Sequence, residues 1–258
     1  MNFLGIIPAR YASTRLAGKP LADIAGKTMI QWVYEAASKA LNTVYVATDD
    51  KRIADVVAAF GGKFVMTKAE HVNGTSRCLE AFDHIKGIES LRFDAVINVQ
   101  GDEPLLHPES LEMLKSCFAD GEVDFATLVK PITSTEDLFS DSDVFVTLNK
   151  FNEAMYFSRS VIPFVRGQQK EDWLAHGTFY KHLGLYAYTY EALSTFAALP
   201  PSPLEMLENL EQLRWLENGG KIRAAITPHD SYSVDTETDL LRVREIMAQQ
   251  QVKSTSSK

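Results

Sequence analysis

Basic charge is scarce in this chain, and so is cysteine. The 258 residues hold 26 lysines and arginines against 34 aspartates and glutamates, which gives a formal net charge of −8. A nucleic-acid-binding surface needs surplus positive charge to neutralise phosphates, so this balance argues against a general nucleic-acid binder. Only Cys78 and Cys117 are present. This count argues against a disulfide framework and a structural zinc site, and it favours a reducing cytoplasm.

Long apolar runs and glycine-rich nucleotide motifs are lacking too. No apolar stretch approaches the roughly 20 residues that span a bilayer, and the N-terminus MNFLGIIPAR does not resemble a signal peptide. We therefore expect a soluble cytoplasmic protein that does not bind membranes. Gly18-Lys19 is followed by Pro20, so it is not a Walker A loop, and no G-x-G-x-x-G follows the first expected strand. The second absence argues against a dinucleotide oxidoreductase.

Short apolar runs alternate with amphipathic stretches over the first half of the chain. Hydrophobic residues make up 45% of the sequence, which is enough for a sizeable core. Buried strands are predicted over Phe3–Pro8, Val44–Thr48, Ala95–Val99 and Phe125–Val129. Helices are predicted over Met29–Ala40, Lys51–Phe60, Ser76–Ile85 and Pro108–Ala119, with Asp49–Asp50 and Thr75 as N-caps of the second and third. This order predicts an α/β fold with a mostly parallel central sheet and helices on both faces.

The rhythm changes after about residue 130. Three strands are predicted, over Val144–Leu148, Met155–Ser158 and Leu183–Tyr188, with a mobile loop or lid at Arg166–Thr178. The α/β character then returns with a helix, a strand and a helix at Pro203–Glu217, Ile222–Ile226 and Thr236–Gln250. We therefore expect an α/β core formed by residues 1–130 and 200–248 and a smaller antiparallel insertion, 131–199, that covers the site and dimerises. Residues 249–258 are polar and are expected to be disordered.

The loop after the first strand gathers three cations in an acidic protein. The stretch IIPARYASTRLAGKP, residues 6–20, carries Arg10, Arg15 and Lys19 together with the hydroxyls of Ser13 and Thr14. Ligands of open α/β sheets bind beyond the carboxyl ends of strands, where this loop lies. Guanidinium groups bind phosphate oxygens in pairs and lysine adds a point charge, so the loop favours polyphosphate binding. The alternative is a solvated basic loop.

Two carboxylates at separate strand ends are candidates for a divalent cation. In VINVQGDEP, residues 96–104, Asp102 follows a buried strand and a tight turn at Gly101. Far downstream, Asp235 lies in the sequence SVDT, where N-capping of the last helix is an equally good interpretation and Thr236 competes for that capping position. Together with a phosphate-binding loop, the pair fits a Mg²⁺–nucleotide site.

A third polar loop, HVNGTSR, covers residues 71–77. Asn73-Gly74 predicts a turn and Thr75 a helix start, and backbone amides with Arg77 are placed to contact a base edge. Taken alone, an ordinary surface loop is the better interpretation.

Eight motifs occur together in one order: IPARYASTRLAGKP at residues 7–20, ATDD at 47–50, NGTSR at 73–77, NVQGDEP at 98–104, YFSRSVIP at 156–163, KHLGLYAY at 181–188, PSPLEMLENLEQLRWL at 201–216 and VDTETDL at 234–240. In this order they closely resemble the 3-deoxy-D-manno-octulosonate cytidylyltransferase family, the CMP-Kdo synthetases. The resemblance spans nearly the whole chain.

The resemblance implies a Rossmann-like nucleotidyltransferase fold and a homodimeric enzyme. Such an enzyme couples CTP to the sugar acid Kdo and gives CMP-Kdo and pyrophosphate for lipopolysaccharide assembly. Carried over by position, the catalytic residues are Lys19, Arg10, Asp102 and Asp235, and the last two bind Mg²⁺. The CTP-binding residues are Arg10, Ser13, Thr14, Arg15, Lys19, Asn73, Thr75, Arg77 and Asp102. The sugar-acid pocket in the inserted subdomain and beside it is formed by Gln100, Arg159, His182, Tyr186, Glu211 and Gln212.

Three positions depart from the family pattern. Ala17 replaces a usual proline, Ser76 replaces a usual carboxylate in the cytosine loop, and Phe145 replaces the lysine of a Val-Lys-Val-Val strand. Two of these changes alter charge, so a modified Kdo such as its 8-amino-8-deoxy form is a hypothesis for the substrate.

Other interpretations stay open. Another acid sugar such as neuraminic acid would use the same chemistry. A non-catalytic regulatory protein that binds sugar nucleotides is a different class, against which the retained Lys19, Asp102 and Asp235 argue.

Overall fold

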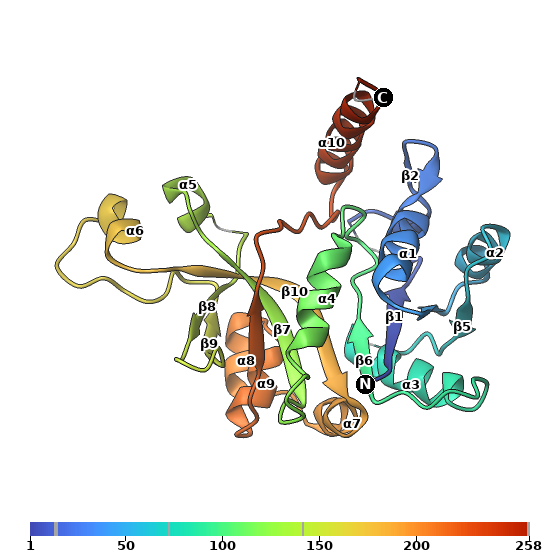
Figure 1. Ribbon diagram of the computed structural model, residues 1–258, viewed down its shortest axis with the longest axis horizontal. Coiled ribbons are helices and arrows are strands. Elements are labelled where there is room, and N and C mark those ends of the chain that lie inside the picture. The colour runs from blue at the N-terminus through green and yellow to red at the C-terminus, as the bar shows by residue number, and fades with distance from the viewer. Residues whose placement is uncertain (13–14, 72, 141, 257–258) are drawn as a thin grey trace. The chain divides into compact units, whose positions relative to one another are not determined.

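A computed structural model describes residues 1–12, 15–71, 73–140 and 142–256 (Figure 1). The α/β fold class is confirmed. The chain divides into two compact units, Met1–Leu111 with Ser231–Lys258, called unit 1, and Glu112–Asp230, called unit 2. The expected boundaries at 130 and 200 differ from these. The strand that begins at Phe125 and the one that ends at Ile226 pair with each other, so both belong to unit 2.

Unit 1 is built on four parallel strands: β1 (Phe3–Ala9), β4 (Thr43–Thr48), β5 (Phe64–Met66) and β6 (Ala95–Asn98). Their order is β6-β1-β4-β5. The helices are α1 (Met29–Ala40), α2 (Lys51–Ala59), α3 (Gly74–Ile85), the start of α4 (Pro108–Ser116) and α10 (Glu237–Ser256). A short η1 helix (Lys19–Leu21) and a β2–β3 hairpin (Asp23–Ile24, Lys27–Thr28) follow β1.

The strand order explains where a ligand can enter unit 1. The chain moves outward from β1 to β4 and β5 and then returns to the other side of β1 to form β6. Right-handed crossovers therefore place α1 and α2 on one face of the sheet and α3 on the other. The carboxyl ends of β1 and β6 flank the point where the direction reverses. Open α/β sheets bind ligands at such a point.

The helix ends of unit 1 follow the sequence in part. Asp50 caps α2 as expected, because its carboxylate accepts a hydrogen bond from Arg52 N. The N-cap expected at Thr75 is wrong: Asn73 caps α3 and accepts from Ser76 N. The expected disorder from residue 249 is wrong as far as Ser256, since α10 continues to that residue. The Gln-Gln-Gln-Val-Lys sequence at 249–253 contains glutamine and lysine, which have a high helix propensity.

Unit 2 is mostly antiparallel. Its strands are β7 (Phe125–Pro131), β8 (Phe145–Leu148), β9 (Ala154–Ser158), β10 (Tyr180–Thr189) and β11 (Arg223–Ile226). β10 pairs antiparallel with β7 and β8, β8 pairs antiparallel with β9, and β11 pairs parallel with β7. The helices are α5 (Thr135–Leu138), η2 (Lys170–Asp172), α6 (Trp173–His176), α7 (Tyr190–Ala198), α8 (Pro203–Glu208) and α9 (Gln212–Glu217).

Two expectations for unit 2 need correction. The single helix expected over 203–217 is broken into α8 and α9, because Asn209 adopts the left-handed conformation with φ 52°. The segment expected as a lid, 166–178, forms η2 and α6, and the buried Trp173 packs it on Phe179. Among the described residues, no helix combines the length and apolarity needed to cross a membrane.

Candidate functional site

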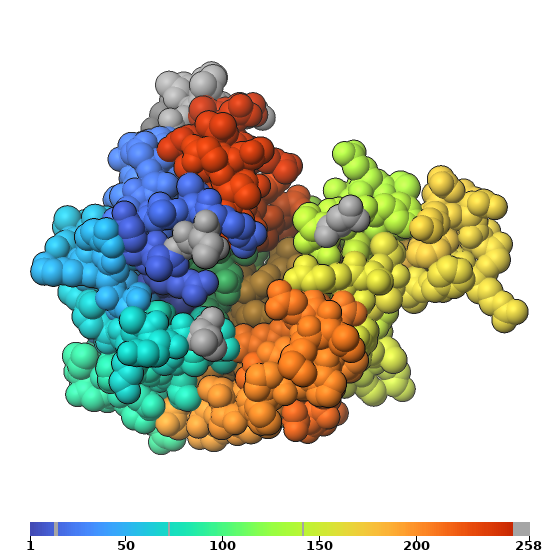
Figure 2. Space-filling model, turned by 180° about the vertical axis from the view of Figure 1, so that it is seen from behind, coloured from blue at the N-terminus to red at the C-terminus, as the bar shows by residue number. Residues whose placement is uncertain are grey.

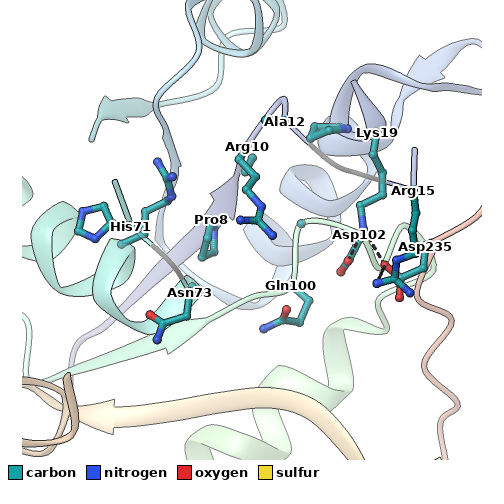
Figure 3. Close-up of a pocket in the computed structure, with 15 residues that line it drawn as sticks. Pro8, Arg10, Ala12, Arg15, Lys19, His71, Asn73, Gln100, Asp102 and Asp235 are labelled. Atoms are coloured by element: carbon teal, nitrogen blue, oxygen red, sulfur yellow. Dashed lines mark hydrogen bonds and ion pairs between the residues drawn. The ribbon is translucent and has the colours of Figure 1, made fainter. Parts of the chain in front are cut away.

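Unit 1 contains a cavity of about 400 Å³ at the carboxyl ends of β1 and β6. This volume lies within the usual range for small-molecule pockets. Figure 3 shows its walls. In Figure 2 the N-terminal part of the chain, which contributes lining residues from Pro8 onward, lies next to the segment near residue 70, which contributes His71 and Asn73. The lining residues are Pro8, Ala9, Arg10, Ala12, Arg15, Lys19, Pro20, His71, Asn73, Gly74, Arg77, Gln100, Gly101, Asp102 and Asp235.

Lys19 joins the two candidate metal ligands. Its Nζ atom lies 2.6 Å from Asp102 Oδ2 and 3.2 Å from Asp235 Oδ1. Arg15 Nη2 lies 3.2 Å from the same oxygen of Asp235. Loops that are 83 and 216 residues away from Lys19 thus bring both carboxylates to one ammonium group. The sequence prediction that these side chains share a site is supported by this geometry.

Asp235 does not cap the last helix. The Thr236 hydroxyl accepts a hydrogen bond from Asp239 N, and the Asp239 carboxylate in turn accepts from the backbone N–H of Asp235 and Thr236. This reciprocal arrangement satisfies the start of α10 and leaves the Asp235 carboxylate to Lys19 and Arg15. The backbone is held as well, because Val234 N donates to Asp102 O over 2.9 Å.

The loop after β1 is fastened at both ends. Gly18 N donates to Tyr11 O over 3.0 Å, and Gly18 has φ +68°, a conformation that glycine adopts without strain. The Arg52 guanidinium lies 3.3 Å above the Tyr11 ring centre and pairs with Asp50. These contacts hold the loop that places Lys19. Ser13 and Thr14, two of the predicted CTP-binding residues, lie outside the described residues.

Gly101 is required by a close approach of two strand ends. A Cβ atom at this position would lie 2.8 Å from Pro8 O. From the sequence, Gly101 was expected to permit a tight turn. The structure gives a second reason for glycine here, because the loop that carries Asp102 passes directly against the end of β1. A side chain at residue 101 would displace Asp102 from Lys19.

The side of the cavity formed by residues 71–77 differs from the expectation. Arg77 lines the cavity, but its guanidinium is buried, donates to Thr67 Oγ1 over 2.6 Å and pairs with Asp49 at 3.4 Å. It therefore fastens α3 to the strand ends in addition to any contact with a base. Thr75 is buried in the first turn of α3 and is not among the lining residues. Asn73 lines the cavity as predicted.

Sequence reasoning missed His71, whose ring lines this side of the cavity. Its only signal was its place directly before the Asn73-Gly74 turn, and a lone histidine is an ordinary surface residue by default.

Glu103 lies buried directly behind Asp102. Burial raises the pKa of Glu103 to about 7, the negative charge of Asp102 adds to the rise, and a hydrogen bond with Ser231 opposes it. This buried group ties the Asp102 loop to the segment that leads to Asp235.

In unit 2, His182 and Tyr186 lie on one face of β10, with ring centres 5.4 Å apart. Desolvation lowers the pKa of His182 to about 3, so the ring is neutral. Thr127 Oγ1 donates to Leu185 O over 2.8 Å and lies 2.9 Å from His182 Nε2. The Thr127 oxygen must then accept a hydrogen bond from Nε2–H, which leaves Nδ1 as an acceptor for a hydroxyl group. Burial raises the pKa of Tyr186, and the charge of Glu211 adds to this rise.

Arg159 holds the end of α8. Its Nε and Nη2 atoms donate to the carbonyl oxygens of Glu208 and Asn209 over 2.7 and 3.3 Å. The Glu208 carboxylate accepts from Arg159 N and from the Ser158 hydroxyl. The guanidinium expected in the sugar-acid pocket is thus also the group that positions the turn between α8 and α9.

That turn carries the last two predicted residues, Glu211 and Gln212. The glutamates of this region have structural partners: Glu205 pairs with Arg214, Glu211 Oε1 lies 3.9 Å from Nη2 of the same arginine, and Glu217 accepts from Leu204 N. Gln212 is buried, and its amide nitrogen is a buried donor with no acceptor among the residues that the structure describes. A buried donor in this state is suited to a ligand oxygen. Gln100 lines the cavity of unit 1, so the predicted sugar-acid residues are divided between the two units.

Phe145, one of the departures from the family pattern, is fully buried in a core cluster with Leu138, Trp173 and Phe179. The ring therefore contributes to the core of unit 2.

Residues 4–222 match the family model described as cytidylyltransferase. A protein of Parabacteroides distasonis named 3-deoxy-manno-octulosonate cytidylyltransferase is 52% identical over 96% of this chain and 99% of its own length. A Shewanella piezotolerans protein named 8-amino-3,8-dideoxy-manno-octulosonate cytidylyltransferase is 50% identical over 93% of this chain and 96% of its own.

A solved structure of CMP:2-keto-3-deoxy-manno-octonic acid synthetase in complex with CTP superposes with a TM-score of 0.88 at 40% identity. The match covers 97% of this chain and all of that one. The chain belongs to the cytidylyltransferase family, among the 3-deoxy-manno-octulosonate cytidylyltransferases.

Proposed function

We propose that this protein transfers the CMP group of CTP to Kdo, giving CMP-Kdo and pyrophosphate for lipopolysaccharide assembly. The observation that carries the proposal is the convergence of Lys19, Asp102 and Asp235 in the cavity of unit 1. The 52% identity to a protein named for this reaction supports it. We further infer that the enzyme works in the cytoplasm, which the two free buried cysteines support.

The residues present fit a Mg²⁺ ion. Asp102 and Asp235 offer carboxylate oxygens, which this hard cation prefers, and both reach the same ammonium group of Lys19. The ammonium group of Lys19 therefore marks a position between the two carboxylates that attracts positive charge. A bound Mg²⁺ would neutralise phosphate charge and make a coordinated hydroxyl more acidic.

The chain's own residues act mainly by positioning and by charge. In the reaction a bond forms between the anomeric oxygen and the α-phosphorus, and the bond from that phosphorus to the oxygen bridging the α- and β-phosphates breaks. The bridging oxygen leaves with pyrophosphate, and the hydroxyl proton passes to water. Arg10, Arg15 and Lys19 line the cavity with cationic groups that bind the phosphates and stabilise the charge of the departing pyrophosphate. In unit 2, neutral His182 and the buried amide of Gln212 are suited to sugar hydroxyls.

Kdo is the primary candidate among sugar acids, and its 8-amino form is the second. The similarity to the Shewanella piezotolerans protein favours including that second candidate. The replacement at Phe145 gives it little support, because that ring is part of the core.

The deciding experiment measures pyrophosphate release with CTP, UTP or GTP, with Mg²⁺ or EDTA, and with Kdo, 8-amino-Kdo or no acid. We expect release that requires CTP, Mg²⁺ and Kdo together. Preference for the 8-amino compound would change the named substrate while keeping the reaction. Binding of CTP with no release under any condition would favour a non-catalytic regulatory protein.

A further inference from the structure

His71 has contacts that the proposed reaction does not explain. Its imidazole lines the cavity of unit 1 beside Asn73 and Gly74. Figure 3 shows His71 and Asn73 on one side of the cavity and Lys19, Asp102 and Asp235 on the other. If the phosphates lie at the cationic cluster, His71 lies at the end left for the nucleoside.

One ring nitrogen is held by a carboxylate. His71 Nε2 is hydrogen-bonded to Glu80 Oε2, an oxygen that also accepts from Lys68 N over 3.0 Å. Burial opposes ionisation of Glu80, but the hydrogen bonds from His71 and Lys68 outweigh it, so the pKa of Glu80 is lowered. His84 Nε2 also lies 4.0 Å from the second carboxylate oxygen. Glu80 is thus an ionised acceptor that fixes the direction of the ring.

The other ring nitrogen contacts the loop that forms the cavity wall. His71 Nδ1 lies 3.1 Å from Ser76 Oγ, which donates to Asn73 Oδ1 over 2.8 Å. Asn73 Oδ1 also accepts from Ser76 N over 2.9 Å and so caps α3. A continuous series of contacts therefore runs from Glu80 through His71 and Ser76 to Asn73.

The series also accounts for the departure at Ser76. Ser76 and Glu80 are four residues apart on α3 and so lie on the same face of the helix. Residue 76 supplies no carboxylate, but Glu80 supplies one a turn further along the helix. The Glu80 carboxylate acts on the loop through the imidazole of His71. A ring held at both nitrogens cannot rotate, so it presents a fixed edge to the cavity.

We propose that His71 is a positioning residue for the nucleoside part of the bound nucleotide, and that Glu80 acts on the same part through His71. The inference rests on the proposed function only in taking CTP as that nucleotide. It assigns the two ends of the cavity different tasks: cationic side chains bind the triphosphate, and the Glu80–His71–Ser76 series sets the loop that meets the base and ribose.

The test compares two ligands by calorimetry in the presence of Mg²⁺: CTP and inorganic tripolyphosphate, which has the charge but no nucleoside. For His71→Ala and Glu80→Gln we expect the affinity for CTP to fall roughly tenfold, the usual effect of losing a charge-assisted hydrogen bond. The affinity for tripolyphosphate should stay within about twofold, because this ligand has no nucleoside and sites without shared partners act independently. His71→Gln, whose amide can still donate to Glu80, should recover part of the loss.

Asp83→Asn is the matched control, because Asp83 lies on the same helix and pairs with exposed Lys86. Thermal unfolding confirms that each variant is folded, and if His71→Ala does not fold, Glu80→Gln decides. Unchanged CTP affinity in a folded variant, or an equal loss for CTP and tripolyphosphate, would overturn the inference. Because the test measures CTP binding and contains no Kdo, its outcome does not depend on whether the protein catalyses the proposed reaction.

Discussion

At the residue scale, the cavity of unit 1 depends on a balance of four charges. Two carboxylates, Asp102 and Asp235, face two cations, Lys19 and Arg15, within ion-pair distance. A divalent cation placed between the acids would compete with Lys19 and leave its ammonium group to the phosphates. The same carboxylates pair with Lys19, and under the proposed function they would also serve a metal ion.

Neutralising either acid should stop the reaction and leave the fold intact. We expect Asp102→Asn and Asp235→Asn each to lower kcat about 100-fold or more, as removal of a group that stabilises charge in a transition state does. Their free energies of unfolding should change by less than about 1 kcal/mol, because these ion pairs are partly exposed. Steady-state kinetics and urea unfolding measure both. Asp55→Asn, which removes an exposed partner of Lys51, is the control; full activity in either site variant would remove that residue from the metal site.

His182 predicts a dependence of stability on pH. Its pKa is about 3 in the folded protein, against an ordinary value of 6.5 for a solvated histidine side chain. Below pH 6.5 the unfolded chain therefore binds a proton that the folded chain does not, so stability is lost as the pH falls from 6.5 toward 3. The loss from this group is at most about 1.4 kcal/mol per pH unit.

Urea unfolding at pH 7.5 and 5.0 measures this effect as a double difference. The wild type should lose more stability between the two pH values than His182→Gln, which has no titrating ring. Other titrating groups contribute equally to both proteins and cancel. Equal losses would show that the His182 ring titrates normally in the folded state.

At the element scale, sequence patterns predicted the helices whose ends depend on neighbouring residues. They missed a helix break that depends on contacts with a distant part of the chain. The helix expected over Met29–Ala40 coincides with α1 at both ends. The continuous helix expected over 203–217 is wrong, because Arg159 from the end of β9 binds the carbonyl groups at the end of α8 and stabilises the turn at Asn209. The hydrophobic period continues across that turn, so local pattern alone could not reveal the break.

Gly18 predicts how the phosphate loop responds to a side chain. Alanine there should lower the free energy of unfolding by about 1–2 kcal/mol, because φ +68° is strained for a residue with a Cβ. The Cβ atom would also lie 3.1 Å from the Tyr11 ring, so the loop must shift and the KM for CTP should rise. Gly61→Ala is the matched control, since Gly61 has φ +80° and open space around it. An equal KM for CTP in both variants would contradict the expected role of the Tyr11 contact.

At the scale of the whole molecule, the candidate site was easier to predict than the boundaries of the units. Parallel strands put their carboxyl ends on one edge, so cations after β1 and a carboxylate after β6 had to meet there. The position of Asp235 did not follow from that rule, and its side chain was equally compatible with capping until Thr236 and Asp239 were seen to cap α10. The unit boundaries depend on the pairing of β11 with β7, between strands about a hundred residues apart, which no local pattern encodes.

Homodimerisation through unit 2 is the remaining proposal at this scale. Unit 2 exposes large apolar side chains on β9 and α8: Met155 is 64% exposed, Met206 68% and Leu207 82%. Exposed apolar side chains of this size on one unit are typical of a surface that is covered by a partner.

Light scattering after size-exclusion chromatography tests it. The wild type should have twice the chain mass of 28.8 kDa, and Met155→Glu with Leu207→Glu should reduce it to the mass of one chain, because two buried charges without partners oppose association. Ile88→Glu is the control, since Ile88 is 69% exposed on unit 1 and its change should leave the dimer intact. A wild-type protein with the mass of one chain at micromolar concentration would reject dimerisation, and a double variant that stays dimeric would move the interface away from β9 and α8.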